Sequence, residues 1–245
     1  MSTNFKNYIN VYEFECELPG SGKIVKYKPI TTGQMKKLLI YENETSPVIQ
    51  EKALDDLISS SVIDEDFDIN KIYLEDRFFL LIEMRKNTKG KNFKFEFKCP
   101  KCKTVSPQTI NLDSLKVVKL KDIKINTKIE LTEQISVELK HVTRGEQKEL
   151  EKYLDLNVSE TQQMVEMQLL GYAAGITKII TPDGEETPKI LDKKWMLENT
   201  PPAILDKLKN WYNNTAFGVE FTYTAKCISC KNSEVMDIPL TNFFF

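Results

Sequence analysis

The chain has 245 residues, 41% of them hydrophobic and 29% charged, which is the composition of an ordinary folded soluble protein of one large domain or two small ones. Its formal net charge of −2 argues against a general nucleic-acid binder, because phosphate neutralisation needs a basic surface. No apolar run approaches the roughly 18 residues of a membrane span, and residues 1–10 lack the apolar core of a signal peptide. We therefore expect neither a membrane span nor secretion.

The first part of the chain predicts a hairpin, helices and an aromatic strand. Apolar residues alternate over 12–18 and return over 24–27, on either side of a Pro-Gly-Ser-Gly turn, which is typical of two half-buried strands. Phenylalanines then alternate with polar residues over 93–97, and this strand leads directly into Cys99. Three helical stripes stand between these strands, over 34–41, 51–60 and 73–86.

The same order of patterns begins again after a basic linker, residues 116–124. A hairpin is expected over 129–139, and Val142–Glu146 then resembles Ile30–Gln34 as a Thr-x-Gly helix start. Ser159 and Gln162 fit a capping box that opens the next helix. A further helix is expected from Thr200-Pro201, with Thr200 as its N-cap and Pro201 in its first turn. An aromatic strand, Cys227 and a returning strand follow it.

These parallels predict an α+β protein with an internal duplication. The related halves are expected over residues 10–115 and 123–245, each a β-hairpin, helices and a hairpin that carries a Cys-x-x-Cys knuckle. A polar hairpin over 179–190 accounts for the greater length of the second half. The alternative is coincidence between common elements, because the halves share little identity outside the motifs.

Two Cys-x-x-Cys knuckles carry the metal chemistry of this sequence. In each, the spacing lets both sulfurs point at one centre, and tetrahedral zinc needs two such pairs. Neither knuckle is completed locally, because Cys16 and His141 are the only other soft ligands and cannot bring two sites to four ligands each. We therefore predict one structural zinc shared by both knuckles. Its ligands are Cys99, Cys102, Cys227 and Cys230.

Other interpretations of the cysteines and of possible catalytic groups remain open at this level. The alternatives to a shared zinc are that the knuckles are unmetallated thiol turns or redox pairs, and Cys16 has the alternation of a small core residue. His141 has no accompanying nucleophile motif and is interpreted as a surface or capping residue, while Trp195 and Trp211 are expected in the core. We therefore expect no enzyme activity and no small-molecule substrate.

Three aromatic residues end the chain: Phe243, Phe244 and Phe245. Three such rings are costly to leave in water, so we expect them to be covered. One interpretation is that they dock on a partner protein as binding residues, and the other is that they close the core of this chain.

Four short segments, which together extend over most of the chain, carry a resemblance to a known family. They are Leu18–Lys23, Gln34–Leu39, Cys99–Cys102 with the following Ile110–Leu112, and Ile238–Phe245. In the order of these motifs the chain resembles the baseplate hub proteins of T4-like contractile-tailed phages. The resemblance implies a hub subunit or a hub assembly factor and transfers no catalytic residues.

The resemblance also implies partners and a location. The partners would be other hub and tail proteins, and the protein would be in the virion baseplate, after a period in the host cytoplasm during assembly. The rival interpretation is a zinc-ribbon module that binds nucleic acid. Lysines flank both knuckles, but the acidic charge of the whole chain favours a role for them in balancing thiolate charge.

Overall fold

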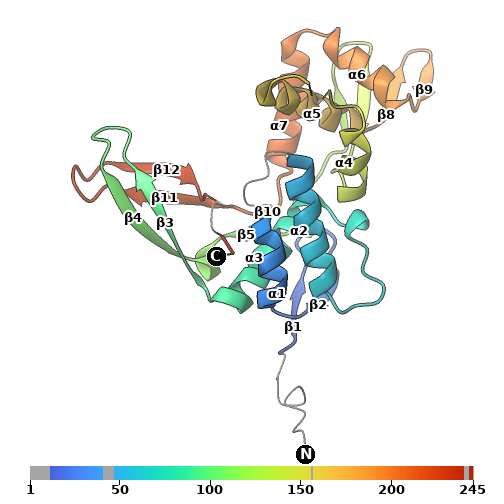
Figure 1. Cartoon of the computed structure of the whole chain (residues 1–245). Helices are drawn as coiled ribbons and strands as arrows, with labels where there is room; N and C mark the ends of the chain where they lie inside the picture. The colour runs from blue at the N-terminus through green and yellow to red at the C-terminus, as the bar shows by residue number, and fades with distance from the viewer. Residues whose placement is uncertain (1–11, 41–46, 156, 240–242, 245) are drawn as a thin grey trace, which may run out of the picture. The chain divides into compact units, whose positions relative to one another are not determined.

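The computed structural model describes residues 12–40, 47–155, 157–239 and 243–244 of the chain. In these ranges helices alternate with short antiparallel sheets, so the α+β class is confirmed (Figure 1). The sheets are two-stranded, except for one of four strands with the order β6-β7-β8-β9. The architecture is therefore a set of small hairpins with helices between them.

The chain divides into two compact units. Unit 1 comprises residues 1–67, 78–118 and 218–245, and unit 2 comprises residues 68–77 and 119–217. This division does not coincide with the predicted halves, 10–115 and 123–245, because both knuckle hairpins belong to unit 1. Each half does contain the expected order of hairpin, helices and knuckle hairpin. The duplication itself stays a prediction.

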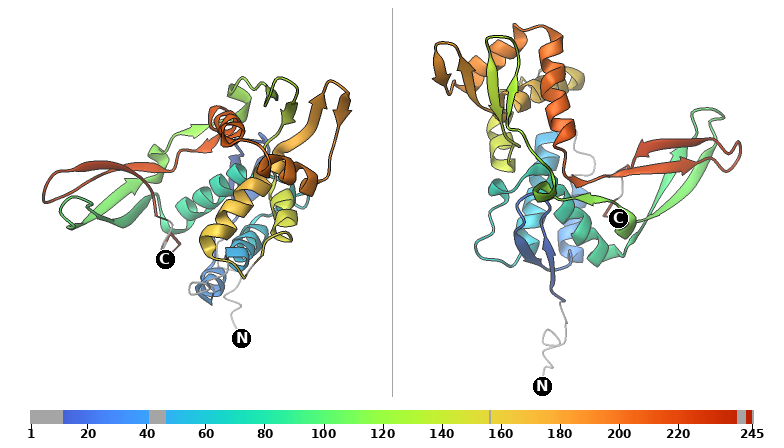
Figure 2. Two further views of the ribbon diagram at one scale, coloured as in Figure 1. Left: turned by 90° about the horizontal axis from the view of Figure 1, so that it is seen from above. Right: turned by 180° about the vertical axis from the view of Figure 1, so that it is seen from behind.

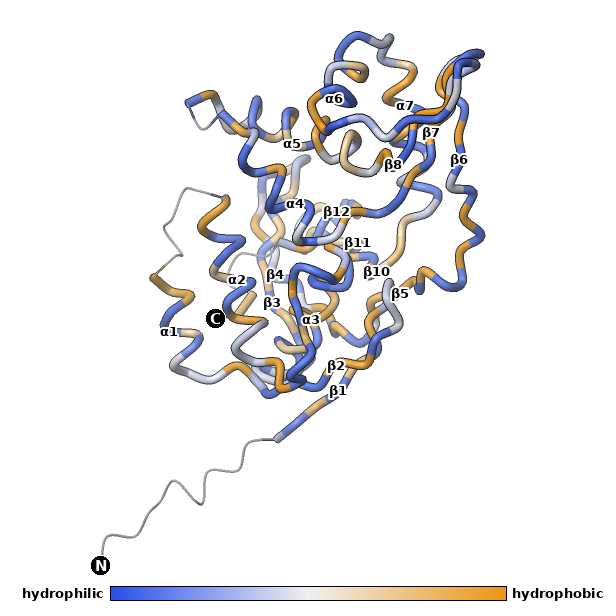
Figure 3. The backbone as a smooth tube through the Cα atoms, turned by 90° about the vertical axis from the view of Figure 1, so that its right-hand side faces the viewer, coloured by the Kyte–Doolittle hydropathy of each residue, from blue (hydrophilic) through white to orange (hydrophobic). Residues whose placement is uncertain are grey.

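Unit 1 begins with the predicted hairpin, β1 (Phe14–Glu17) paired with β2 (Ile24–Tyr27). Its turn buries Leu18, and β2 buries Val25 and Tyr27, as the alternation predicts. Polar and apolar residues are interspersed along the helices that follow (Figure 3). These helices are α1 (Thr32–Ile40), α2 (Pro47–Ser61) and the part of α3 (Leu74–Lys89) that lies within unit 1. Helix α2 buries Leu57 and Ile58, whereas the first of these helices, α1, buries none of its residues.

Two knuckle hairpins lie side by side in unit 1 (Figures 1 and 2). The first pairs β3 (Asn92–Lys98) with β4 (Val105–Asn111), and the second pairs β11 (Thr222–Lys226) with β12 (Ser233–Asp237). β3 buries all three of its phenylalanines on one face, as its period of two predicts. The hairpins thus bring two distant stretches of chain into one layer.

A short sheet also joins the two stretches that lead into and out of unit 1. β5 (Val117–Val118) pairs with β10 (Gly218–Val219), so part of the predicted linker is a strand. Single 3-10 turns complete the connections, η2 (Ile69–Lys71), η3 (Leu112–Ser114) and η4 (Leu120–Asp122).

Unit 2 is built on the four-stranded antiparallel sheet. Its strands are β6 (Lys128–Glu130), β7 (Ser136–Leu139), β8 (Ile176–Thr181) and β9 (Gly184–Glu186). Its helices are α4 (Arg144–Glu151), α5 (Glu160–Gly175), α6 (Ile190–Glu198) and α7 (Pro202–Asn214). Sheet and helices share one apolar core formed by Leu131, Val137, Leu139, Ala173, Ile176, Ile179, Leu197, Ile204, Leu208 and Trp211. The capping box of Ser159 and Gln162 opens α5 as predicted.

Two local expectations in unit 2 are wrong. Helix α6 was not expected, and it holds Trp195 at its surface with 66% of the residue exposed, whereas Trp211 is buried in the core as predicted. The residue that caps α7 is Pro201 and not Thr200, whose hydroxyl donates instead to the carbonyl of Leu197. Both errors arise where one short helix turns directly into the next.

The two Thr-x-Gly helix starts differ in how much room their glycines have, which makes a testable pair. A Cβ at Gly145 would lie 2.8 Å from the carbonyl oxygen of Asn70, whereas one at Gly33 would meet only Thr31 Oγ1 at 3.8 Å. We therefore expect Gly145→Ala to lower the free energy of unfolding by about 1–3 kcal/mol, the usual cost of overpacking. Gly33→Ala, the control, is expected to be neutral or slightly stabilising because alanine favours helix. Equal effects in chemical denaturation would contradict this account.

Candidate metal centre

The two knuckles are equivalent turns at the ends of the two hairpins. In the first, the Cys99 N–H donates to the carbonyl of Thr104 at 2.9 Å, and the Lys103 N–H donates back to the carbonyl of Cys99. In the second, the Cys227 N–H donates to the carbonyl of Asn232 at 2.8 Å, and the N–H of the lysine after Cys230 donates back to Cys227. The same sequence pattern therefore folds into the same hydrogen-bonded loop twice.

The lysine after each second cysteine has a left-handed backbone. Lys103 has φ of 63° and Lys231 has φ of 60°, and these are the only non-glycine residues with positive φ among those described. L-residues adopt this conformation at a cost, so it persists where the surrounding structure fixes it. In each knuckle, this conformation turns the backbone toward the second strand of the hairpin, directly after the second cysteine.

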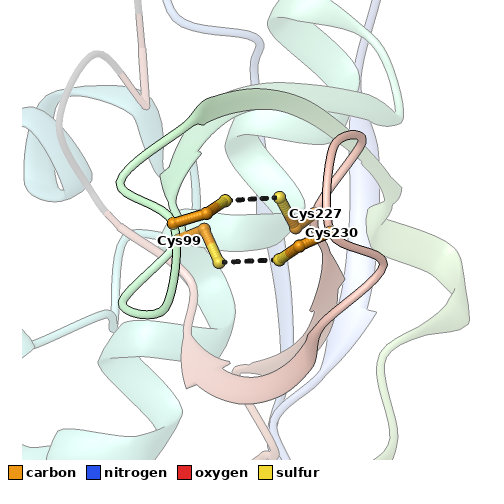
Figure 4. A group of neighbouring side chains, drawn as sticks. Cys99, Cys227 and Cys230 are labelled. Carbon is orange, nitrogen blue, oxygen red and sulfur yellow. Dashed lines mark hydrogen bonds between the residues drawn. The ribbon is translucent and has the colours of Figure 1, made fainter.

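The four sulfur atoms of the knuckles come together at one point. All four Sγ atoms lie within 4.8 Å of one another. Cys99 Sγ lies 3.6 Å from Cys230 Sγ, and Cys102 Sγ lies 3.5 Å from Cys227 Sγ, so both contacts join one knuckle to the other (Figure 4). The thiols are free, and these separations are much longer than the roughly 2.05 Å of a disulfide. The prediction that the distant knuckles meet is therefore confirmed.

This arrangement fits the dimensions of a tetrahedral zinc site. Zinc–sulfur bonds of about 2.3 Å at tetrahedral angles separate sulfur atoms by about 3.8 Å. The two inter-knuckle contacts are slightly shorter than this value, and no sulfur–sulfur separation exceeds it by more than about 1 Å. Four thiolates would close the coordination shell, and a closed shell belongs to a structural and not a catalytic ion. The donor set thus has the composition and the spacing that zinc requires.

The surroundings of the thiols are apolar on one side and open on the other. Cys99 and Cys227 are fully buried, together with Phe97 and Ala225, whereas Cys102 is exposed. Tyr223, Cys230 and Met236 pack against this cluster. The first cysteine of each knuckle is therefore part of the hairpin core, and the second lies nearer the surface.

Hydrogen bonds to the sulfurs favour the thiolate form that a metal needs. The hydroxyl and the N–H of Thr104 lower the pKa of Cys102 to about 6, and the N–H groups of Cys230 and Ser229 lower the pKa of Cys227. The N–H of Asn232 acts in the same direction on Cys230, but burial and the neighbouring thiols together raise the pKa of Cys230 to about 11. Four thiols without a cation between them therefore do not all ionise together.

Two polar side chains on β4 attach the first hairpin to the second. Gln108 is buried, and its Nε2 donates to the carbonyl of Lys226 at 3.1 Å while its Oε1 accepts from the Lys226 N–H at 3.4 Å. Ser106 Oγ accepts from the Ile228 N–H, at the start of the second knuckle. Both were missed from the sequence, although the alternation of β4 places them on the same face as Ile110. The signal available in the sequence was a pair of polar residues at strand positions that the alternation assigns to the inward, apolar face.

Removal of the Gln108 side chain is expected to loosen the contact between the hairpins. Gln108→Ala leaves both main-chain groups of Lys226 without their partner, so the free energy of unfolding should fall by about 1–3 kcal/mol. The neighbouring Thr109→Ala is the control, because Thr109 lies on the exposed face of β4. Amide exchange should accelerate in β11 for Gln108→Ala only, and unchanged exchange there would contradict the assigned role.

The terminal aromatic residues lie against unit 1. Phe243 and Phe244 are buried, and the Phe243 ring meets Phe93 at 5.1 Å and Phe221 at 5.8 Å between centroids. The Arg85 Nε donates to the carbonyl of Phe243 at 3.1 Å. These positions match the interpretation in which the rings close the core of the chain. Docking on a partner stays a prediction, and Phe245 lies outside the described residues.

Neither of the two other soft ligands is a member of the sulfur cluster. Cys16 is half-buried in β1, and His141 lies in unit 2. His141 is buried, with only 8% of the residue exposed, so its interpretation as a surface or capping residue is wrong. Among the described residues, the four knuckle cysteines form the one group that has the composition and spacing of a metal site.

Comparison with known proteins identifies the family. No curated protein and no solved structure matches the chain. The family described as T4 bacteriophage base plate protein matches residues 9–245, which is nearly the whole length. Since the match includes both knuckles and leaves out only residues 1–8, the chain belongs to the T4 bacteriophage base plate protein family.

Proposed function

We propose that this protein is a structural interaction protein of a contractile phage tail, acting in the baseplate hub as a subunit or as an assembly factor. The observation that carries the proposal is the family match over residues 9–245. A baseplate family favours a structural and not a catalytic role. The partners are then other hub and tail proteins, and the protein acts in the virion tail after assembly in the host cytoplasm.

We propose further that one structural zinc holds the two knuckle hairpins together. The ligands are Cys99, Cys102, Cys227 and Cys230, whose mutual distances support the proposal. When bound, the ion supplies a fixed tetrahedral link between stretches of chain 128 positions apart. The chain supplies the rest: two equivalent turns, an apolar base under the first cysteine of each knuckle, and N–H groups directed to the sulfurs.

The rival function, a zinc-ribbon module for nucleic acid, is not favoured. The net charge is −2, and the family match is to a baseplate protein. Binding to DNA or RNA that weakens steeply as salt is raised would favour the rival, because phosphate contacts release counterions. We expect no such binding.

No helix in the described part of the chain is long and apolar enough to cross a membrane.

The role in the tail is tested by quantitative mass spectrometry of purified tails and of purified baseplate intermediates from the source virus. A permanent hub subunit is expected in both preparations at a fixed ratio to other baseplate proteins. An assembly factor is expected in the intermediates and not in finished tails. Absence from both preparations, in infections that express the protein, would overturn the proposal.

A further inference from the structure

Unit 2 contains a cavity of about 250 Å³ whose lining includes none of the knuckle cysteines. It lies between the first turn of α3 and helices α4, α5 and α7, and every residue that lines it belongs to unit 2. Its volume is below the roughly 300–1,000 Å³ of sites for drug-sized ligands, so it suits a single side chain or a small amine. The residues that line it include Glu75, His141, Gly171, Tyr172 and Tyr212.

Two buried acceptor atoms in this cavity have no hydrogen-bond partner. They are Glu75 Oε2 and His141 Nε2, and they are the only such side-chain atoms among the described residues. Buried polar atoms are nearly always paired, so an unpaired one needs an explanation. Here the two residues that carry these atoms both line the same cavity, which indicates a donor group bound in that cavity as their missing partner.

The state of His141 makes its free nitrogen an acceptor. Burial lowers the pKa of His141, so the ring is neutral at ordinary pH. Its other nitrogen is used in a hydrogen bond with the main chain of Thr215, which leaves Nε2 with a lone pair. Burial also raises the pKa of Glu75 to about 7, with a smaller contribution from the charge of Asp76. Above that pH the cavity holds a carboxylate whose Oε2 atom has no hydrogen-bond partner, although the main-chain N–H of Glu75 bonds to the carboxylate.

Two tyrosine rings complete the cavity. Tyr172 and Tyr212 stack with centroids 5.7 Å apart, and Tyr212 meets the His141 ring edge-on at 5.7 Å. Ring faces attract cations, and buried carboxylates need a positive partner. A complementary group would therefore be positive and would carry N–H donors without acceptors, as guanidinium and ammonium groups do.

We infer that this cavity binds a cationic group, a guanidinium or a primary ammonium, which donates to Glu75 and His141 beside the two tyrosine rings. The group is either the side chain of an arginine or lysine on a partner protein, or a free small amine. The chemistry of the cavity does not depend on where in the tail the protein acts. A result that contradicts the proposed function would therefore not contradict the binding of a cation in this cavity.

The test uses the full-length protein at pH 8 and follows the imidazole nitrogen signals of His141 by NMR. Because the chain has one histidine, these signals need no assignment by mutation. N-acetyl-arginine amide, which presents its side chain as a protein would, should shift them saturably. The neutral analogue N-acetyl-citrulline amide should bind at least about tenfold more weakly, the effect expected for loss of a charged hydrogen bond. Putrescine distinguishes the sources, since tighter binding of putrescine than of the arginine amide would assign the site to a free amine.

Two variants localise the binding. Glu75→Gln keeps the shape and removes the charge, so it should weaken binding at least about tenfold, whereas the exposed Glu149→Gln should leave it unchanged. Gly171→Leu should fill part of the cavity and weaken binding, because Gly171 lines the cavity, a Cβ there meets nothing within 4 Å, and leucine favours helix. No saturable shift with either cation, an equal response to citrulline, or unchanged binding in Glu75→Gln would each overturn the inference.

Discussion

Substitution of Cys227 by serine is expected to destabilise both knuckle hairpins, although the residue belongs to only one of them. The four sulfurs lie within 4.8 Å of one another, so loss of one ligand opens the shell that serves the other three. Metal affinity of a structural site is also folding free energy. Structural zinc sites contribute several kcal/mol to the free energy of unfolding, and in a chain of this size each kcal/mol changes the melting temperature by a few degrees. We therefore expect the melting temperature to fall by about 10 °C or more.

The decisive readout for this variant is amide exchange in the hairpin that was not mutated. Exchange should accelerate in β3 and β4 as well as in β11 and β12, because in the proposed site a single ion would hold both the Cys99–Cys230 contact and the Cys102–Cys227 contact. Cys16→Ser is the matched control, since Cys16 lies outside the cluster, and it should retain both the metal and the exchange pattern. Acceleration confined to β11 and β12 would show that the hairpins are stabilised separately.

Removal of the last three residues is expected to destabilise unit 1. Phe243 is buried among Phe93, Phe221 and Phe244, and Arg85 lies over its ring at 5.8 Å while donating to its carbonyl. Truncation of a buried phenylalanine to alanine costs about 3–5 kcal/mol through lost burial and a residual cavity. We therefore expect Phe243→Ala alone to cost that amount, and the three-residue deletion to cost more.

The control for Phe243→Ala and for the three-residue deletion is Val235→Ala. Val235 is 69% exposed on β12, so its substitution should have little effect on stability. Thermal and chemical denaturation give the stabilities, and reconstitution of hub intermediates gives assembly. If the truncated chain keeps its stability but no longer assembles, the terminal rings act in docking and not in the core. If it loses stability as expected, its failure to assemble says nothing about docking, and the core interpretation holds.

The strands of this protein could be predicted because their signals are local. Alternation of Phe93, Phe95 and Phe97 is enough to place β3 and its buried face, since successive side chains of a strand point to opposite sides. The cysteine cluster could be predicted for a different reason. Ligand counting leaves four cysteines and one closed shell, so the long-range contact follows from chemistry and not from pattern.

The features that could not be predicted depend on which elements meet in three dimensions. His141 is one residue on a short connection, and its burial follows from the rings of Trp211, Tyr212 and Phe217 that pack on it from a distant helix and its following turn. Trp195 stays exposed because α6 presents Leu197, not the tryptophan, to the core. The compact units differ from the predicted halves because the second hairpin packs on the first through Gln108, a contact that no local pattern encodes.

The central claim, one ion shared by four thiolates, is tested most directly by the metal content of the folded protein. The protein is purified from zinc-supplemented cells without added metal or chelator, and native mass spectrometry is combined with titration of thiols in the folded state. We predict one zinc per chain, with Cys99, Cys102, Cys227 and Cys230 protected until the protein is denatured or the metal is removed. A chain without metal whose four knuckle thiols all react freely in the native state would contradict the account.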